Sequence, residues 1–473
     1  PQGPPELVPE YFGFENAVNR AGEACEVLLT LRNRGAEPGR LEDASLKLPR
    51  GLRILEAPDM TEQPLRYDER AALRWQIAAD AAGEYDVTLR LRGDGVKARP
   101  GETLRFLPPV DLPHVAYVPE PRPVAMDSEV CMYYFPGWPT NAAWDCIRLT
   151  APNRKPLLGY YDASDPEVVD WQIKWAVENG ISCFLVDWYW NQGHRHLEHW
   201  FQAYRRARYR DMLDVAIMWA NHLPPGSHTI EDWRNVTRHW IEAYFPLPSY
   251  YHLNGKPAVF IWDPNNIRND LGGAEAAKAA YAESQAMAQA AGYAGIEFVA
   301  LHGHESRARV DMLIEEGYAA TTTYHEWGDA VAMTDTPKRM RFEDVAATAP
   351  QAWRAKEELV APLTYYPVVD TGWDSRPWHG SRARVFSGRT PALFEELLRA
   401  AKRYSATHDG RMVVLGPANE WGEGSYIMPC TEFGFDMLEA VRRVFARGRA
   451  ETWPQNIAPQ DVGLGPYDLP TPP

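Results

Sequence analysis

The feature that most constrains the fold of this 473-residue chain is an eightfold alternation of apolar runs with helical patterns after residue 128. The apolar runs are short and nearly continuous, as in parallel strands that are buried on both faces. They are Val130–Phe135, Ser182–Trp188, Asp214–Trp219, Ala258–Trp262, Ile296–His302, Ala319–Tyr324, Ala361–Val368 and Met412–Leu415. Eight such units predict an α/β fold built as a closed (β/α)8 TIM barrel. An open doubly wound sheet is the alternative, because periodicity does not show closure.

The segments between these runs carry helix start and stop signals. In residues 166–179, Asp165 can cap the helix N-terminus, Pro166 suits the first turn, and Gly180 can end the helix. We therefore predict a helix over this segment as part of the second β/α unit.

The first hundred residues follow a different pattern. Between about residues 6 and 107, apolar residues alternate with polar ones, as at Cys25, Val27, Leu29 and Leu31. Period two indicates half-buried antiparallel strands, and short strands separated by turn residues predict an immunoglobulin-like β-sandwich. We expect an N-terminal β-sandwich accessory domain at 1–107, a Pro-rich linker at 108–127, the catalytic barrel at 128–450 and a Pro-rich C-terminal tail at 451–473.

Charge and cysteine content argue against several classes of protein. Asp and Glu outnumber Lys and Arg by 64 to 49, and no basic cluster interleaves with aromatics, so nucleic acid is not an expected partner. The five cysteines lack C-x-x-C spacing and predict neither a disulfide framework nor a zinc site. No apolar run approaches the ~20 residues of a membrane span. The opening Pro1-Gln2-Gly3-Pro4-Pro5 resembles the stub left by removal of a signal or tag, so we expect a secreted or periplasmic protein.

Polar and aromatic residues gather where the apolar runs end. In a barrel all eight of these ends lie on one face, where active sites of this fold occur, and aromatic rings suit the apolar faces of sugars. We therefore predict a sugar-binding mouth, although each residue could instead pack the mouth without touching substrate. The candidate substrate-binding residues are Tyr134, Trp138, Asp187, Trp188, Trp190, His194, Trp219, Asn221, His302, Tyr324, His325, Trp373, Asp374, Asn419 and Trp421.

The segment Asn419-Glu420-Trp421-Gly422-Glu423-Gly424 follows the last apolar run and is the strongest candidate for catalysis. It places two carboxyl groups three positions apart beside a tryptophan. One carboxyl can protonate a leaving oxygen while the other, kept ionised, removes a proton or stabilises positive charge. The alternative is a loop with two surface acids. The recurrence of such residues at every strand end favours the catalytic interpretation.

Five motifs together resemble a known family. They are Tyr133-Tyr134-x-Pro-Gly-Trp138, Gly159-Tyr160-Tyr161-Asp162, Asp187-Trp188-Tyr189-Trp190, Gly372-Trp373-Asp374 and Asn419-Glu420-Trp421-x-Glu423-Gly424. Over roughly residues 128–445 the chain resembles glycoside hydrolase family 99, and most of all the family-99-like group that includes WbsX-type proteins of polysaccharide gene clusters. The resemblance implies a retaining glycosidase for α-linked, manno-configured oligosaccharides or polysaccharides, with no metal and no organic cofactor.

The resemblance also implies roles for the two glutamates. Glu420 would be the base that removes the proton of the sugar 2-hydroxyl, which attacks to give a 1,2-anhydro sugar. Glu423 would protonate the departing oxygen and then deprotonate water. These roles lead us to expect that Glu423 is the more buried of the two, with a raised pKa, while Glu420 stays ionised.

The chain departs from the family pattern at Gly422, where endo-α-mannosidases of the family carry histidine. The WbsX-like branch shares this glycine, and its substrates are diverse. We therefore expect α-mannosides or α-rhamnosides, which share an axial O2, as substrates in polysaccharide breakdown.

Other interpretations stay open. A noncatalytic glycan-binding or polysaccharide-assembly protein would not need both acids, and a transferase using a sugar nucleotide would need a diphosphate-handling feature, which the sequence does not show convincingly. His302, His304 and Glu305 could chelate a metal, but no further ligand can be named. The long connections 324–341 and 370–390 could enclose the substrate, which favours an exo-acting or short-oligosaccharide enzyme.

Overall fold

The computed structural model describes residues 3–59, 63–331, 333, 339–408 and 411–470. Part of the predicted N-terminal stub, the end of the predicted tail and part of the 324–341 connection lie outside these residues.

The eight predicted strands form one curled parallel sheet. Its strands are β9 (Val130–Tyr134), β10 (Cys183–Asn191), β12 (Asp214–Trp219), β14 (Lys256–Ile261), β15 (Glu297–Ala300), β16 (Ala320–Thr321), β18 (Thr364–Tyr365), β19 (Val368–Val369) and β21 (Val413–Leu415). The hydrogen-bonded order is β18-β16-β15-β14-β12-β10-β9-β21-β19. β18 and β19 are two pieces of the predicted seventh strand, so the two ends of this order meet in one chain segment. The sheet and its helices form a TIM-barrel-like fold.

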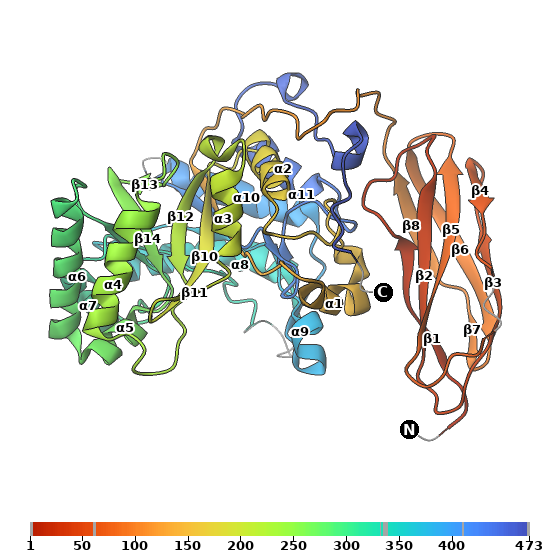
Figure 1. Cartoon of the computed structure of the whole chain (residues 1–473), viewed down its shortest axis with the longest axis horizontal. Coiled ribbons are helices and arrows are strands. Elements are labelled where there is room, and N and C mark those ends of the chain that lie inside the picture. The colour runs from red at the N-terminus through yellow and green to blue at the C-terminus, as the bar shows by residue number, and fades with distance from the viewer. Residues whose placement is uncertain (1–2, 60–62, 332, 334–338, 409–410, 471–473) are drawn as a thin grey trace.

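Helices cover the outside of the sheet (Figure 1). The predicted helix at 166–179 is confirmed as α2 (Pro166–Glu178), and the Asp165 side chain accepts a hydrogen bond from the Glu167 amide. The other helices are α1 (Asn141–Thr150), α3 (His199–Arg206), α4 (Ile230–His239), α5 (Pro264–Leu271), α6 (Ala274–Ala290), α7 (Arg307–Glu316), α8 (Phe342–Val360), α9 (Arg376–His379), α10 (Pro391–Ala406) and α11 (Asp436–Phe445). Short helical turns are η1 (Pro152–Arg154), η2 (Arg210–Met212), η3 (Trp240–Tyr244), η4 (Gly380–Arg382), η5 (Ala450–Thr452) and η6 (Pro459–Val462).

Alternate residues of each barrel strand belong to two different cores. Cys131, Tyr133 and Leu185 pack in the barrel interior, whereas Met132 and Tyr134 pack between the sheet and the helices. Successive side chains of a strand point to opposite faces, so this division follows from residue parity. Parity therefore decides which residue near a strand end can reach the barrel mouth.

The N-terminal residues form a separate antiparallel domain with two sheets around a common core. One sheet has the order β1 (Leu7–Phe14), β2 (Cys25–Asn33), β5 (Arg70–Ala79), β4 (Leu52–Glu56). In the other, β6 (Gly83–Gly93) pairs with β3 (Leu41–Lys47), β7 (Val96–Ala98) and β8 (Gly101–Phe106). Val27, Leu29, Trp75 and Leu89 fill the core between them. The immunoglobulin-like topology stays a prediction.

The C-terminal segment links the antiparallel domain to the barrel (Figure 1). The buried Arg20 of the first domain pairs with Asp461 and donates to the Pro108 carbonyl at 2.8 Å. Nearby, the backbone carbonyl of Ile457 accepts from Trp175 Nε1 of α2 at 2.9 Å. The Pro-rich tail is thus packed against both parts.

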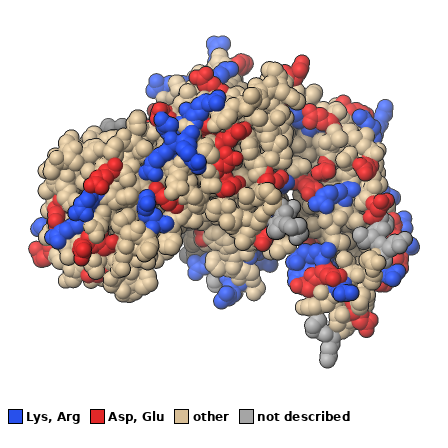
Figure 2. All heavy atoms as spheres, viewed as in Figure 1, with Lys and Arg blue, Asp and Glu red and all other residues tan. Residues whose placement is uncertain are grey.

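The charged surface is mixed. On the face shown in Figure 2, acidic and basic side chains lie interspersed over the barrel and the antiparallel domain. Within the described ranges, no helix combines the length and apolar character that crossing a membrane would require.

Candidate active site

The Asn419–Gly424 motif forms a tight hairpin beyond the eighth barrel strand. β22 (Asn419–Glu420) pairs with β23 (Ser425–Tyr426), and the Glu423 amide donates to the Glu420 carbonyl at 3.1 Å. Gly424 has a φ of 71°, which glycine adopts without steric cost. The turn brings the side chains of Glu420 and Glu423 into one cleft.

A third acid and a tyrosine complete the polar floor of this cleft. Tyr324, which follows β16, places its hydroxyl 2.8 Å from Asp187 Oδ2 and 3.0 Å from Glu420 Oε2. A phenol has one proton and can donate to only one carboxylate at a time. Both contacts can therefore be hydrogen bonds only when one of the two carboxyl groups is protonated.

The electrostatics favour the same conclusion. Burial raises the pKa of Asp187 and of Glu420 well above the ordinary range, and the charge of Glu423 raises both further. Burial also raises the pKa of Glu423, against an opposing effect of His325. Three carboxyl groups this close disfavour one another's ionisation, so the cluster favours holding a proton.

The expected division between the two glutamates is wrong. Glu420 is only 7% exposed, whereas Glu423 is half-buried, and burial raises the pKa of both carboxyl groups. The reason is position in the hairpin: Glu420 ends a strand that faces the barrel interior, while Glu423 lies in the turn. Deeper burial therefore disfavours the ionised form of Glu420.

His325 lies beside Glu420 and Glu423, and Asp370 orients its ring. Its Nδ1 lies 2.9 Å from the fully buried Asp370, and its Nε2 has no hydrogen-bond partner among the described residues. One ring nitrogen of His325 and one oxygen each of Glu420 and Glu423 lie within 4.8 Å of one another. One histidine backed by a carboxylate, with two further carboxylates, could hold a divalent cation. In the described part of the chain, no other group meets this criterion; the predicted set His302, His304 and Glu305 does not.

The cleft around these groups has a volume of about 990 Å³. The predicted residues that line it are Asp187, His302, Tyr324, His325, Trp373, Glu420 and Glu423. The edge of Trp262 meets His302 at 5.0 Å between ring centroids. Burial lowers the pKa of His302, and that of His304 to about 4, so both rings are neutral at neutral pH.

Six predicted substrate-binding aromatics do not line the cleft and are buried elsewhere. Tyr134, Trp188 and Trp219 occupy strand positions whose side chains point outward, and they pack between the sheet and the helices. Trp188, for example, donates to the Tyr244 hydroxyl at 2.9 Å. The other three, which are also buried in that layer, are Trp138, Trp190 and Trp421.

The remaining predicted residues also lie outside the cleft lining. His194 is exposed on the hairpin strand β11 (His194–His196), and Asn221 is buried and bonded to the Asp263 backbone. Asn419 is buried, and its side-chain amide exchanges two hydrogen bonds with the Phe135 backbone. Asp374 lines a neighbouring cavity. These residues support the mouth and do not face the acids.

Sequence reasoning missed Phe135, Tyr189, Lys356 and Trp378 as cleft residues. Trp378 on α9 is 41% exposed, and its ring meets Phe135 at 6.1 Å. A Cβ built on Gly422 would lie 2.0 Å from Trp378 Cε2. The small size of Gly422 therefore makes room for the indole that lies against it. The sequence holds two signals that point to Trp378: the departure from the family pattern at Gly422 and the long 370–390 connection.

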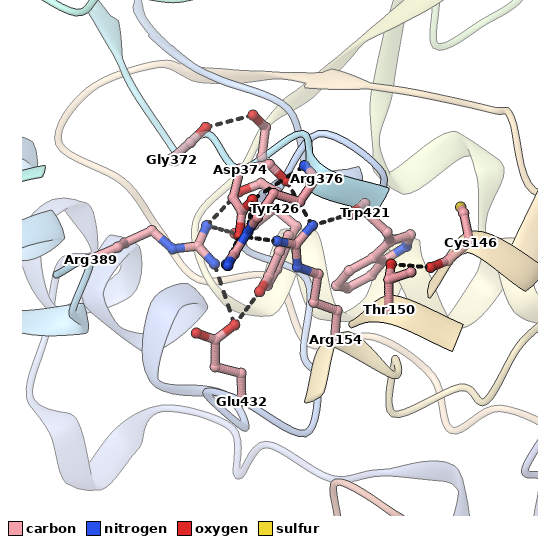
Figure 3. A network of polar contacts seen from close by, with 12 residues as sticks. Cys146, Thr150, Arg154, Gly372, Asp374, Arg376, Arg389, Trp421, Tyr426 and Glu432 are labelled. Atoms are coloured by element: carbon pink, nitrogen blue, oxygen red, sulfur yellow. Dashed lines mark hydrogen bonds and ion pairs between the residues drawn. The ribbon is translucent and has the colours of Figure 1, made fainter. Parts of the chain in front are cut away.

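Two arginines, the buried Arg154 and the half-buried Arg389, hold the hairpin of β22 and β23 (Figure 3). Arg154 donates to the carbonyls of Trp421 and Asp374 at 2.8 and 3.0 Å. Arg389 donates to the carbonyls of Gly424 and Tyr426 at 3.0 and 3.2 Å. The Asp374 amide also donates to the Glu423 carbonyl at 2.5 Å. The backbone on both sides of Glu423 is thus fixed by hydrogen bonds.

Comparison with known proteins agrees with this architecture. The model of the family "Glycosyltransferase WbsX" matches residues 150–441. Proteins named WxcX, from Xanthomonas campestris pv. campestris strain B100 and from a second strain, are 23% identical over 374 residues, covering 71% of this chain and 52% of theirs. The chain thus spans about half the length of the curated relatives it matches.

Two solved structures give the comparison of folds. A glycoside hydrolase-like protein superimposes with a TM-score of 0.52 at 18% identity, covering 71% of this chain and 98% of that structure. A GH99 endo-alpha-mannosidase from Bacteroides thetaiotaomicron gives a TM-score of 0.47 at 17% identity, covering 67% and 97%. The first of these supports a shared glycoside hydrolase-like fold.

Proposed function

Because this chain belongs to the WbsX glycosyltransferase family, we propose that it is a glycan-processing enzyme that hydrolyses an α-linked sugar in the cleft around Glu420 and Glu423. The observation that carries the proposal is the acid pair itself. One buried and one half-buried carboxyl group, with oxygens within 4.8 Å and raised pKa values, offer a proton donor and a proton acceptor at one point.

The spacing supports retention of configuration. Inverting glycosidases separate their two carboxyl groups by about 6.5–9.5 Å to admit a water molecule between acid and base. The shorter distance between Glu420 and Glu423 leaves less room for direct attack by water. Two successive displacements are the consistent alternative.

In the proposed first step, Glu420 accepts the proton of the sugar 2-hydroxyl, O2 forms a bond to C1, and the glycosidic bond breaks. Glu423 gives its proton to the departing oxygen, which leaves a 1,2-anhydro sugar. In the second step the water oxygen bonds to C1 as the C1–O2 bond breaks, Glu423 takes the water proton, and Glu420 returns its proton to O2. An axial O2, as in α-mannosides and α-rhamnosides, can attack from the face opposite the leaving group.

The shared proton must lie on Glu423 when the first step begins, although burial favours Glu420 in the free protein. A sugar hydroxyl that donates to Glu420 stabilises its ionised form and lowers its pKa. Substrate binding therefore shifts the proton from Glu420 to Glu423, which then acts as the acid.

The test is a panel of α-mannans, rhamnose-containing polysaccharides and aryl α-glycosides, digested by the wild type, Glu420→Gln and Glu423→Gln. We expect sugar release by the wild type with retained configuration, and a loss of about 10²–10⁴-fold in each variant. Aryl glycosides with good leaving groups need little protonation. On these substrates the rate of glycosidic bond cleavage by Glu423→Gln should approach that of the wild type.

The exposed Glu315→Gln on α7 is the matched control, and its release of sugar should equal that of the wild type. Full activity of either cleft variant, or release of the inverted anomer, would contradict the mechanism.

A further inference from the structure

A second cavity opens on the same face of the barrel, next to the catalytic cleft. It has a volume of about 900 Å³ and is lined by segments that follow α1 and the sixth, seventh and eighth strands. Its charged lining residues are Arg154, Arg339, Arg376, Arg389, Asp374 and Glu432. Nothing in the proposed hydrolytic step uses this cavity.

The cavity and the cleft share a thin wall. Trp373 lines both of them, while Glu423 lines the cleft and its neighbour Gly424 lines the cavity. The Glu423 carbonyl is held by the Asp374 amide at 2.5 Å. The backbone of the proposed proton donor is therefore part of the partition between the two spaces.

Arginine is concentrated here in an otherwise acidic protein. Four arginines and two carboxylates are found among the described lining residues, in a chain with a formal charge of −15. A chain of this charge repels an anionic ligand in general, so a local positive site is needed wherever such a ligand is bound. In barrels of this kind, the loops after strands seven and eight frequently bind phosphate.

Holding the hairpin explains only some of these arginines. Arg154 is buried and bonded to two carbonyls, and it already pairs with Asp374 at 2.6 Å. Arg376 is 64% exposed and contacts the same carboxylate at 2.6 and 2.8 Å. A second, exposed guanidinium on a carboxylate that is already paired adds little to the hairpin.

Arg389 has donor capacity toward the cavity as well. Its Nη1 is held by the carbonyls of the hairpin, but its Nη2 lies 3.7 Å from Glu432, which is longer than a hydrogen bond. The guanidinium stacks on the Tyr426 ring at 4.2 Å, and the Tyr426 hydroxyl donates to Glu432 (Figure 3). The planar group is thereby oriented, as suits recognition of an oxyanion by arginine.

We propose that this arginine cavity is an anion subsite that holds a phosphate ester or a carboxylate on the leaving-group side of the substrate. The placement of the subsite on the leaving-group side rests on the proposed function, in which Glu423 protonates the departing oxygen. The part of the substrate beyond that oxygen then lies toward the wall that Glu423 shares with the cavity. An acidic glycan and a sugar carried on a phosphate both present such an oxyanion.

The experiment is isothermal titration of the full chain with inorganic pyrophosphate and, separately, with glucuronate. We expect saturable binding of at least one probe, weakened about tenfold in Arg376→Ala, which removes one charged donor from the surface of the cavity. Preference for pyrophosphate identifies a phosphate-bearing leaving group, and preference for glucuronate identifies an acidic glycan. Either result supports the subsite.

The exposed Arg384→Ala, on the same connection but outside the lining, is the matched control and should bind like the wild type. Arg389→Lys keeps the charge but loses the paired N–H donors of the planar guanidinium, so it should weaken binding. The thermal midpoint of this variant reports whether the hairpin is still held. Binding should persist in Glu423→Gln.

The subsite is overturned if neither probe binds, if Arg376→Ala binds like the wild type, or if Arg384→Ala weakens binding equally. Loss of binding in Glu423→Gln would place the probe in the catalytic cleft and would also overturn it. None of these measurements requires turnover, so failure of the hydrolytic proposal and failure of the subsite are separate results.

Discussion

The guanidinium of Arg154, just beyond the first barrel helix, donates to the carbonyl oxygen of Trp421 at 2.8 Å, between the two candidate catalytic glutamates. Arg154 and Trp421 are 267 residues apart in the sequence. Both are buried, and Arg154 also pairs with Asp374. The position of Glu423 therefore depends on an arginine that never faces the cleft.

Replacing Arg154 should disturb both stability and catalysis. In Arg154→Ala the half-buried Asp374 keeps Arg376 as a partner, but the carbonyls of Trp421 and Asp374 lose their donor. We expect a loss of about 1–3 kcal/mol in the free energy of unfolding for each of these carbonyls. Arg154→Lys should fold better but lower kcat more than it raises KM, since its single nitrogen replaces Nη1, which bonds both carbonyls, and Nη2, which pairs with Asp374. Denaturant titration and steady-state kinetics measure these effects. Arg376→Ala is the control for stability, and an equal loss there would contradict the assignment.

The pH profile of hydrolysis should be bell-shaped. Burial raises the pKa values of both members of the pair, Glu420 and Glu423. Activity requires one proton on the pair, so it is lost as the pH falls through the lower of the pair's two pKa values, where both carboxyl groups become protonated, and as it rises through the higher one, where both become ionised. The acid limb should therefore lie above the pKa of about 4.3 of an ordinary glutamate. The measurement is kcat/KM against pH.

The hydroxyl of Tyr324 tests the assignment of that acid limb. Its hydrogen bond lowers the pKa of Glu420, so Tyr324→Phe should move the acid limb to higher pH. An acid limb that stays in place, in a protein that is still folded and active, would show that another group controls it.

Gly422 should tolerate no side chain while Trp378 is present. A Cβ would overlap the indole, and overpacking of this kind costs about 1–3 kcal/mol. We expect Gly422→Ala to lower stability and kcat/KM, and Trp378→Ala to raise KM by loss of an exposed aromatic surface in the cleft. In the double variant the overlap is gone, so the two stability losses should not add. Additive losses would contradict the contact.

The buried pair of Arg20 and Asp461 should couple the antiparallel domain to the barrel. Arg20→Ala leaves Asp461 buried without its guanidinium, and we expect a loss of about 3–5 kcal/mol and two separate transitions in calorimetry. Arg53→Ala removes an exposed pair and should change the unfolding free energy by less than about 1 kcal/mol. A single unshifted transition in Arg20→Ala would show that the two parts are joined by other contacts.

The local chemistry of the sequence determined the elements and the acid pair. Continuous apolar runs placed all eight strands, because strands buried on both faces leave that signature, and the cap at Asp165 and the stop at Gly180 set α2. Parity along the strands also held the information that Asp187 points inward and Trp188 outward.

Tertiary structure alone decided how these groups act together. Contacts across the barrel, such as Tyr324 with Asp187 and Glu420, join segments about a hundred residues apart, and burial at the meeting point raises the pKa values. Desolvation depends on every neighbour in three dimensions, which is why Glu420 and not Glu423 is the deeper acid. The indole on Gly422 and the arginine cavity arise likewise from the 370–390 connection folding back over the hairpin, a path that no local pattern specifies.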